Sequence, residues 1–66
     1  MKTIEGVPYY RFLVRYTLAD GRRLRMVRWS PGFPWVRDEV GRELLDRFGL
    51  EGIRRGSVSI RERGTP

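Results

Sequence analysis

The sequence predicts an α+β fold: a single small ββαβ domain in which one helix packs on one face of a three-stranded sheet. Two segments in which apolar and polar residues alternate flank the loop Ala19-Asp20-Gly21. They are followed by an amphipathic segment with helical spacing and then by a short segment that alternates again. At 66 residues the chain is close to the lower size limit for folding without disulfides or metals. One domain, residues 1–66, is therefore expected.

Residues 9–30 are predicted to form a β-hairpin. Gly21 after Asp20 is typical of a three-residue loop that combines a type I turn with a left-handed residue. A two-residue loop would mix apolar side chains and arginines on both faces, and because a one-residue slip moves every side chain to the other face, the three-residue loop is preferred. It pairs Leu18 with Arg22, Thr17 with Arg23, Tyr16 with Leu24, Arg15 with Arg25, Val14 with Met26, Leu13 with Val27, Phe12 with Arg28 and Arg11 with Trp29.

The hairpin is preceded by residues 1–8, in which Gly6 and Pro8 interrupt any longer element, so that an arm or a short strand is expected. A helix is predicted over residues 34–48, because apolar side chains recur there at every fourth position. Its ends are marked by Pro34 in the first turn and by Gly49, whose left-handed cap would bring Leu50 onto Leu45.

The alternating residues 57–62 predict a third strand. A right-handed crossover through the helix makes this strand parallel to the second, either beside it or beyond the first; the order 2-1-3 is favoured. Before the helix, Phe33 is expected to pack at the helix entry and Trp35 to close one end of the core, rather than to form a ligand-binding loop. The predicted core consists of Tyr10, Phe12, Val14, Tyr16, Leu18, Leu24, Met26, Val36, Val40, Leu44, Phe48, Val58 and Ile60.

Most of the charge lies in the hairpin. The chain has a net charge of +6, and residues 9–30 hold six arginines against one acid, Asp20, a net +5. A surface of one sign attracts polyanions. The arginine bias alone is also typical of a chain that uses arginine in place of lysine throughout, so the clustering rather than the bias carries this argument.

Several function classes are disfavoured. The chain has no histidine and no cysteine, which removes the commonest general base, the thiol nucleophile and the disulfide, so no enzyme activity, small-molecule substrate, metal or cofactor is expected. The helix acids pair with bases four residues later, as in Asp38 with Arg42 and Glu43 with Arg47, which indicates a solvated helix face rather than a metal site. With no signal peptide and no membrane-spanning segment in the sequence, a cytoplasmic location is expected.

The outer face of the predicted hairpin is the candidate functional surface. It combines Arg11, Arg15, Arg23 and Arg25 as phosphate ligands with Trp29 as a stacking platform, a combination suited to single-stranded RNA or DNA more than to duplex. Peripheral charge is expected from Arg28, Arg54 and Arg55. Two alternatives stay open: an ordinary solvated sheet face, and a protein interface that buries Leu13, Val27 and Trp29 against a second copy or an acidic partner.

Overall fold

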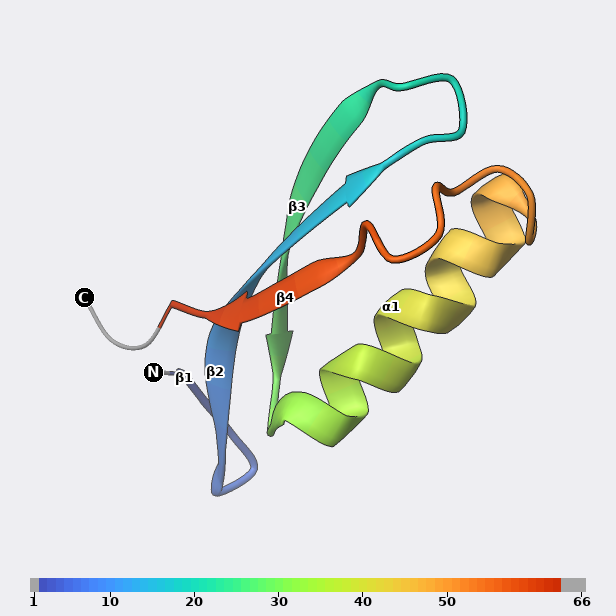
Figure 1. The fold of residues 1–66 in the computed structure, drawn as a ribbon. Helices are drawn as coiled ribbons and strands as arrows, with labels where there is room; N and C mark the ends of the chain where they lie inside the picture. The colour runs from blue at the N-terminus through green and yellow to red at the C-terminus, as the bar shows by residue number, and fades with distance from the viewer. Residues whose placement is uncertain (1, 64–66) are drawn as a thin grey trace.

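A central strand organises the sheet. In the computed structural model, which describes residues 2–63, the elements in chain order are β1 (Lys2–Ile4), β2 (Val7–Thr17), β3 (Arg23–Ser30), α1 (Phe33–Phe48) and β4 (Ser59–Glu62). Each of the other three strands pairs with β2, always antiparallel, and α1 packs on one face of the sheet (Figure 1). The predicted α+β class is confirmed, with four strands instead of three.

The hairpin has the predicted register. Leu18 N–H donates to the Arg22 carbonyl at 2.8 Å and Gly21 N–H donates to the Leu18 carbonyl at 2.9 Å, which closes the three-residue loop. Gly21 has φ of 95°, a conformation that favours glycine. Every predicted pair from Thr17 with Arg23 to Arg11 with Trp29 is present, and the ladder extends by one pair, Tyr10 with Ser30.

The fourth strand is β1. Lys2 lies opposite Tyr9 and Ile4 opposite Val7, so a two-residue turn, Glu5-Gly6, joins β1 to β2. Both turn residues have positive φ, 50° and 80°, as a type I′ hairpin turn requires. The predicted arm or short strand at residues 1–8 is thus a strand that adds to the sheet.

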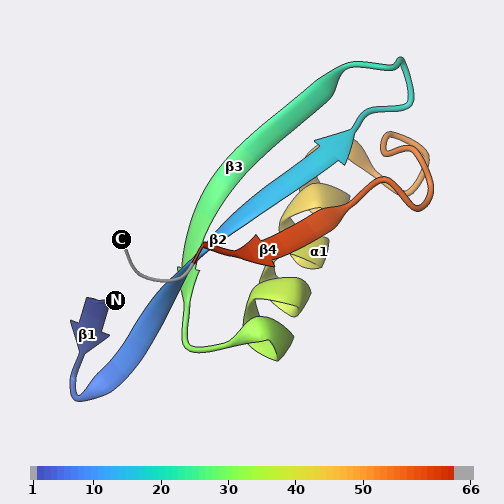
Figure 2. The ribbon, with the colours of Figure 1, turned by 60° about the vertical axis from the view of Figure 1, so that its left-hand side comes forward.

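The sheet order across the helix is β3-β2-β4, which is the predicted 2-1-3 order, with β4 parallel to β3 (Figure 2). The last strand begins at Ser59 rather than at residue 57. Ser57 instead accepts a hydrogen bond from Thr17 N–H at 3.1 Å through its hydroxyl. Nearby, Ile53 forms a bridge to Leu18, so the loop before β4 also follows the end of β2.

The helix begins at Phe33, one residue earlier than predicted, after Gly32, which provides no side-chain cap. Its C-terminal end is at Gly49, whose N–H donates to the Leu45 carbonyl at 2.9 Å. The φ of Gly49 is positive as predicted, 75°, but its ψ of 173° differs from the left-handed helical cap. Leu50 is 86% exposed, so the predicted contact with Leu45 does not bury it.

The core lies between α1 and the facing side of β2. It contains Phe12, Val14, Tyr16, Leu18, Val36, Val40 and Leu44, with Tyr10, Met26, Phe48, Ile53 and Ile60 packed around them. Two predicted members, Leu24 and Val58, are wrong, since both are exposed. Leu24 lies near the loop end of β3, which has β2 as its one strand partner within the described residues, and Val58 lies in the connection before β4. Ile53 was missed because it lies in a loop.

The aromatic residues at the helix entry are exposed as well. Trp35 is 64% exposed, so the prediction that it closes one end of the core is wrong, and Phe33 at the helix entry is about half exposed. The buried stripe of the helix passes through Val36 and Val40, and position 35 precedes this stripe by one residue, which turns its side chain about 100° away. Within residues 2–63, no helix is long and apolar enough to cross a membrane.

Candidate nucleic-acid interface

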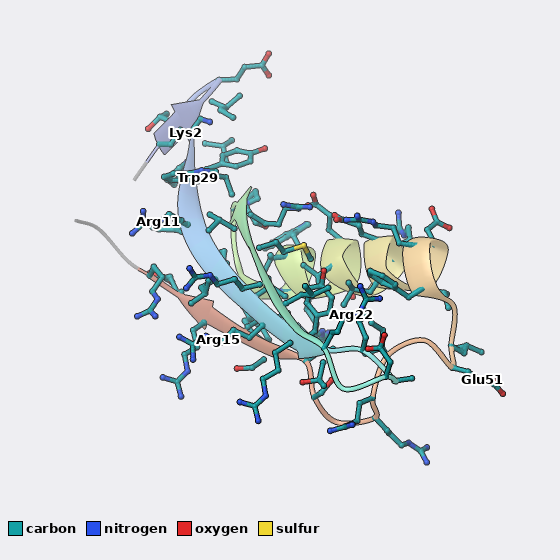
Figure 3. The ribbon with its side chains drawn as sticks, turned by 90° about the horizontal axis from the view of Figure 1, so that it is seen from above. Lys2, Arg11, Arg15, Arg22, Trp29 and Glu51 are labelled. Carbon is teal, nitrogen blue, oxygen red and sulfur yellow. The ribbon has the colours of Figure 1, made fainter. Side chains whose placement is uncertain are left out.

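The sheet face opposite α1, called the outer face below, carries the cations. Side chains alternate along a strand, and directly opposed residues share a face, so the register assigns each residue to one side. Figure 3 shows Lys2, Trp29, Arg11 and Arg15 following one another on the side away from the helix. The basic residues of the outer face are Lys2, Arg11, Arg15, Arg23, Arg25, Arg61 and Arg63, all exposed.

The outer-face residues form rows across three strands. Arg61, Leu13 and Val27 form one row across β4, β2 and β3, and Ser59, Arg15 and Arg25 form the next row. Beyond them, Arg63 N–H donates to the Arg11 carbonyl at 2.8 Å, which continues the pairing past the end of β4. Neighbouring rows on one face are about 7 Å apart and neighbouring strands about 5 Å. Cations therefore surround a short apolar strip made of Leu13, Val27 and Trp29.

No carboxylate neutralises this face. Among the described residues, the ion pairs are Arg22–Asp20, Arg28–Glu43, Arg37–Asp38 and Arg47–Glu43, none of which includes an outer-face cation. Arg15 and Arg25 even lie directly opposite one another, an arrangement of like charges that destabilises a sheet. The face thus keeps its full positive charge available to a ligand.

Arg28 lies on the other side. Its Nε and Nη2 donate to Glu43 Oε1 and Oε2 at 3.1 and 2.5 Å, which joins β3 to α1. This hydrogen-bonded guanidinium holds the pKa of Glu43 below its ordinary value of 4.5 and raises that of Arg28. Arg28 is therefore a structural residue, neutralised by Glu43 and separated from the other predicted site residues.

Arg54 and Arg55 lie at the loop end of the outer face. Arg54 N–H donates to the Thr17 carbonyl at 2.8 Å, and its guanidinium lies beside Gly21 in the hairpin loop. Both arginines are exposed. Their predicted peripheral position agrees with this arrangement.

Trp29 is 39% exposed and borders the outer face at the far end from the hairpin loop. The Lys2 ammonium lies 5.3 Å from the centre of its ring, a cation–π contact. One face of the predicted stacking platform is therefore covered by Lys2.

Sequence reasoning missed three cations of the outer face: Lys2, Arg61 and Arg63. Arg61 could have been predicted from residues 57–62. Side chains alternate between the two faces of a strand, and Ile60 is predicted to face the core, so its neighbour Arg61 must face the other way. The sequence does not assign Lys2 to a face, because an arm and a short strand are both expected at residues 1–8, and Arg63 follows the predicted strand.

Two hollows adjoin the outer face. The smaller, about 340 Å³, lies at the loop end beside Arg15, Arg23, Arg25 and the hydroxyl residues Thr17 and Ser57. The larger, about 690 Å³, lies between the end of the sheet and α1. Aromatic walls come from Tyr9, Trp29 and Trp35, and helix residues including Glu39 and Arg42 complete it. Trp29 therefore belongs both to the outer face and to the larger hollow.

Within the described residues, no group of three or more histidine, cysteine, aspartate or glutamate side chains is arranged to hold a metal ion. Comparisons with known proteins bring no further information: no family model matches the chain, and neither a characterised protein nor a solved structure shows significant similarity to it.

Proposed function

We propose that this domain is a small non-enzymatic module that binds single-stranded RNA or DNA through the outer face of its sheet. The observation that carries the proposal is the collection of seven exposed cations on that face, with no carboxylate among its paired strand positions. Phosphates would be held by Arg11, Arg15, Arg25, Arg61 and Arg63 in the centre and by Lys2 and Arg23 at the ends. Guanidinium groups suit this role because they bind phosphate oxygens in pairs.

The apolar strip favours a single strand over a duplex. A duplex presents mainly phosphates and sugars to a flat cationic surface, whereas a single strand also offers exposed bases. Leu13, Val27 and Trp29 lie between the cations, where bases would cover them while the phosphates contact the arginines. Base contacts of this kind contribute about 1–3 kcal/mol each when the partner is aromatic.

A protein partner is the second candidate, supported by the free edge of β3. In the described part of the chain β3 pairs only with β2, so one edge of Arg23–Ser30 has no strand partner. An open edge accepts a strand of another chain. A second copy or an acidic protein would occupy this edge.

The expected cytoplasmic location, which rests on the sequence alone, stays a prediction.

The test is a fluorescence-anisotropy titration of a labelled mixed-sequence single-stranded RNA at 50 and 200 mM salt, with single-stranded and duplex DNA in parallel. If four to seven phosphates are neutralised, log K falls against log salt with a slope of about −3 to −5 on single strands. Affinity then decreases by about two to three decades between the two salt concentrations. A slope near zero, or no binding at 50 mM salt, would contradict the proposal.

A charge-matched pair of variants separates the outer face from net charge. Arg15→Glu places an acid in the centre of the outer face, and Arg37→Glu makes the same change on the exposed outside of α1. The first is expected to weaken RNA binding at least tenfold and the second by less than threefold. Equal effects would show attraction to the whole molecule rather than to this face.

A change in native mass by light scattering for Trp29→Ala would favour the dimer alternative.

A further inference from the structure

Trp35 is the least explained side chain of the fold. It is 64% exposed at the entry of α1, where an indole gains nothing from water. A Cβ on Gly32 would come within 3.2 Å of the Trp35 ring, so the missing side chain at Gly32 leaves the space in which this ring lies. The ring is thus supported on one side by backbone, and it forms a wall of the larger hollow.

The size and position of this hollow suit one unit of a bound strand. Its volume of about 690 Å³ is in the range of small-molecule sites, which is ample for one nucleotide. Trp29 forms its second aromatic wall and also ends the outer face, so a strand that follows the outer face reaches the hollow at Trp29. A base turned away from the strand at this point would enter a hollow lined by two indoles, and indoles stack on bases.

The carboxylates decide which base fits. Glu43 is bound by Arg28 and Arg47, and Asp38 lies 3.9 Å from Arg37. Glu39 and Asp46 have no ion pair among the described residues, and of these two it is Glu39 that lies four residues after Trp35, which places the two side chains side by side on the helix surface. A free carboxylate at that place accepts hydrogen bonds from a base stacked on Trp35.

We infer that the hollow is a base-reading pocket for guanine, in which Trp35 stacks on the base and Glu39 accepts its hydrogen bonds. Guanine presents two adjacent donors, N1–H and N2–H, to the two oxygens of one carboxylate. Uracil offers a single N–H between two carbonyl oxygens, and these oxygens repel a carboxylate. The inference rests on the proposed binding of a single strand, whose phosphates stay on the outer face, while Arg42 at the rim of the hollow balances part of the acid charge.

The experiment compares labelled RNA oligomers of about eight nucleotides by anisotropy at 50 mM salt. One is all uridine, and three others carry one guanosine at the 5′ end, the centre or the 3′ end. At least one of the three is expected to bind about tenfold tighter than the all-uridine oligomer, the discrimination that a bidentate contact gives. If the all-uridine oligomer binds and guanosine brings no gain at any position, the pocket is overturned while the proposed function stands. If no oligomer binds, the proposed function fails and the pocket with it.

Three variants connect the gain to the pocket. Glu39→Gln and Trp35→Ala are expected to reduce the guanosine gain to twofold or less. Glu51→Gln removes the same charge from the loop at the other end of the helix, far from Trp29 and Arg11 in Figure 3, and is expected to keep the gain. If the carboxylate acts only through its charge, both glutamine variants bind all oligomers more tightly by the same factor. That result would overturn the pocket, as would a guanosine gain that survives Glu39→Gln.

Discussion

The two faces of β2 follow opposite physical rules although their residues alternate along a single strand. Toward α1, Phe12, Val14 and Tyr16 are buried and packed against helix valines and leucines. Toward solvent, Arg11 and Arg15 lie among other cations, and no acid within residues 2–63 forms an ion pair with them. The first arrangement stabilises the fold, whereas like charges in direct opposition destabilise it. This difference is the reason for our proposal that the outer face serves a ligand rather than the fold.

The largest expected effect is the difference in lost stability between two adjacent residues of β2, Phe12 and Leu13, which lie on opposite faces. Phe12→Ala is expected to lower the free energy of unfolding by about 3–5 kcal/mol, because it leaves a cavity in the core. A domain of this size has only about 3–10 kcal/mol in total, so the variant loses a large share of its stability. Leu13→Ala, the next residue on the outer face, is expected to cost less than about 1 kcal/mol. Urea denaturation followed by circular dichroism measures both, and similar losses would contradict the division of the faces.

The junction between the helix and the end of β2 is expected to be the next most sensitive place. Gly52 lies where a Cβ would approach the Phe48 carbonyl oxygen within 2.1 Å, and the Gly52 carbonyl accepts a hydrogen bond from Ala19 N–H at 2.8 Å. Gly52→Ala must therefore shift backbone and is expected to cost about 1–3 kcal/mol. Gly41→Ala, where an added Cβ meets nothing within 4 Å, is the matched control and is expected to stabilise the helix. Equal midpoints in urea would refute this view of the junction.

The sequence predictions are accurate for pairing within the hairpin and less accurate for contacts between distant segments. The register of the hairpin was predictable because Asp20-Gly21 limits the turn and because only one register separates apolar residues from arginines. Arg11, Arg15, Arg23 and Arg25 follow from that register. Contacts between distant segments were not predictable to the same degree, since the sequence does not say which helix acid meets Arg28.

The helix entry shows a second limit. The apolar character of Phe33 and Trp35 predicts packing at the helix entry and at one end of the core, but the stripe of Val36, Val40 and Leu44 already determines which side of the helix is buried. Trp35 lies outside that stripe, and the hollow that it lines forms only when the end of β3 and α1 come together. A cavity of this kind has no local sequence signal.

The Arg28–Glu43 ion pair, which joins β3 to α1, is expected to give a pH-dependent contribution to the free energy of unfolding. Arg28 lowers the pKa of Glu43 below 4.5, so the pair stabilises the fold above about pH 4.5, and this contribution is lost as the pH falls through the lowered pKa. Glu43→Gln is expected to cost about 1 kcal/mol at pH 7, since the pair is partly exposed. The difference between the wild type and this variant should shrink toward pH 3. Asp20 titrates in both proteins and cancels, so a constant difference would contradict the assignment.

The smallest expected effect is also the sharpest test of the comparison between the two faces of β2, because the substitution is expected to raise the free energy of unfolding rather than to lower it. Arg25→Thr removes one partner of the opposed Arg15–Arg25 pair and introduces a residue that favours strands. The variant is expected to be more stable than the wild type by about 0.2–1 kcal/mol at low salt, and less so at high salt, because screening weakens the repulsion. Single-stranded RNA binding should weaken in the same variant. A domain that gains stability while it loses affinity is what the proposed division between a stabilising and a ligand-binding face requires; a variant that loses both would place Arg25 among the structural residues.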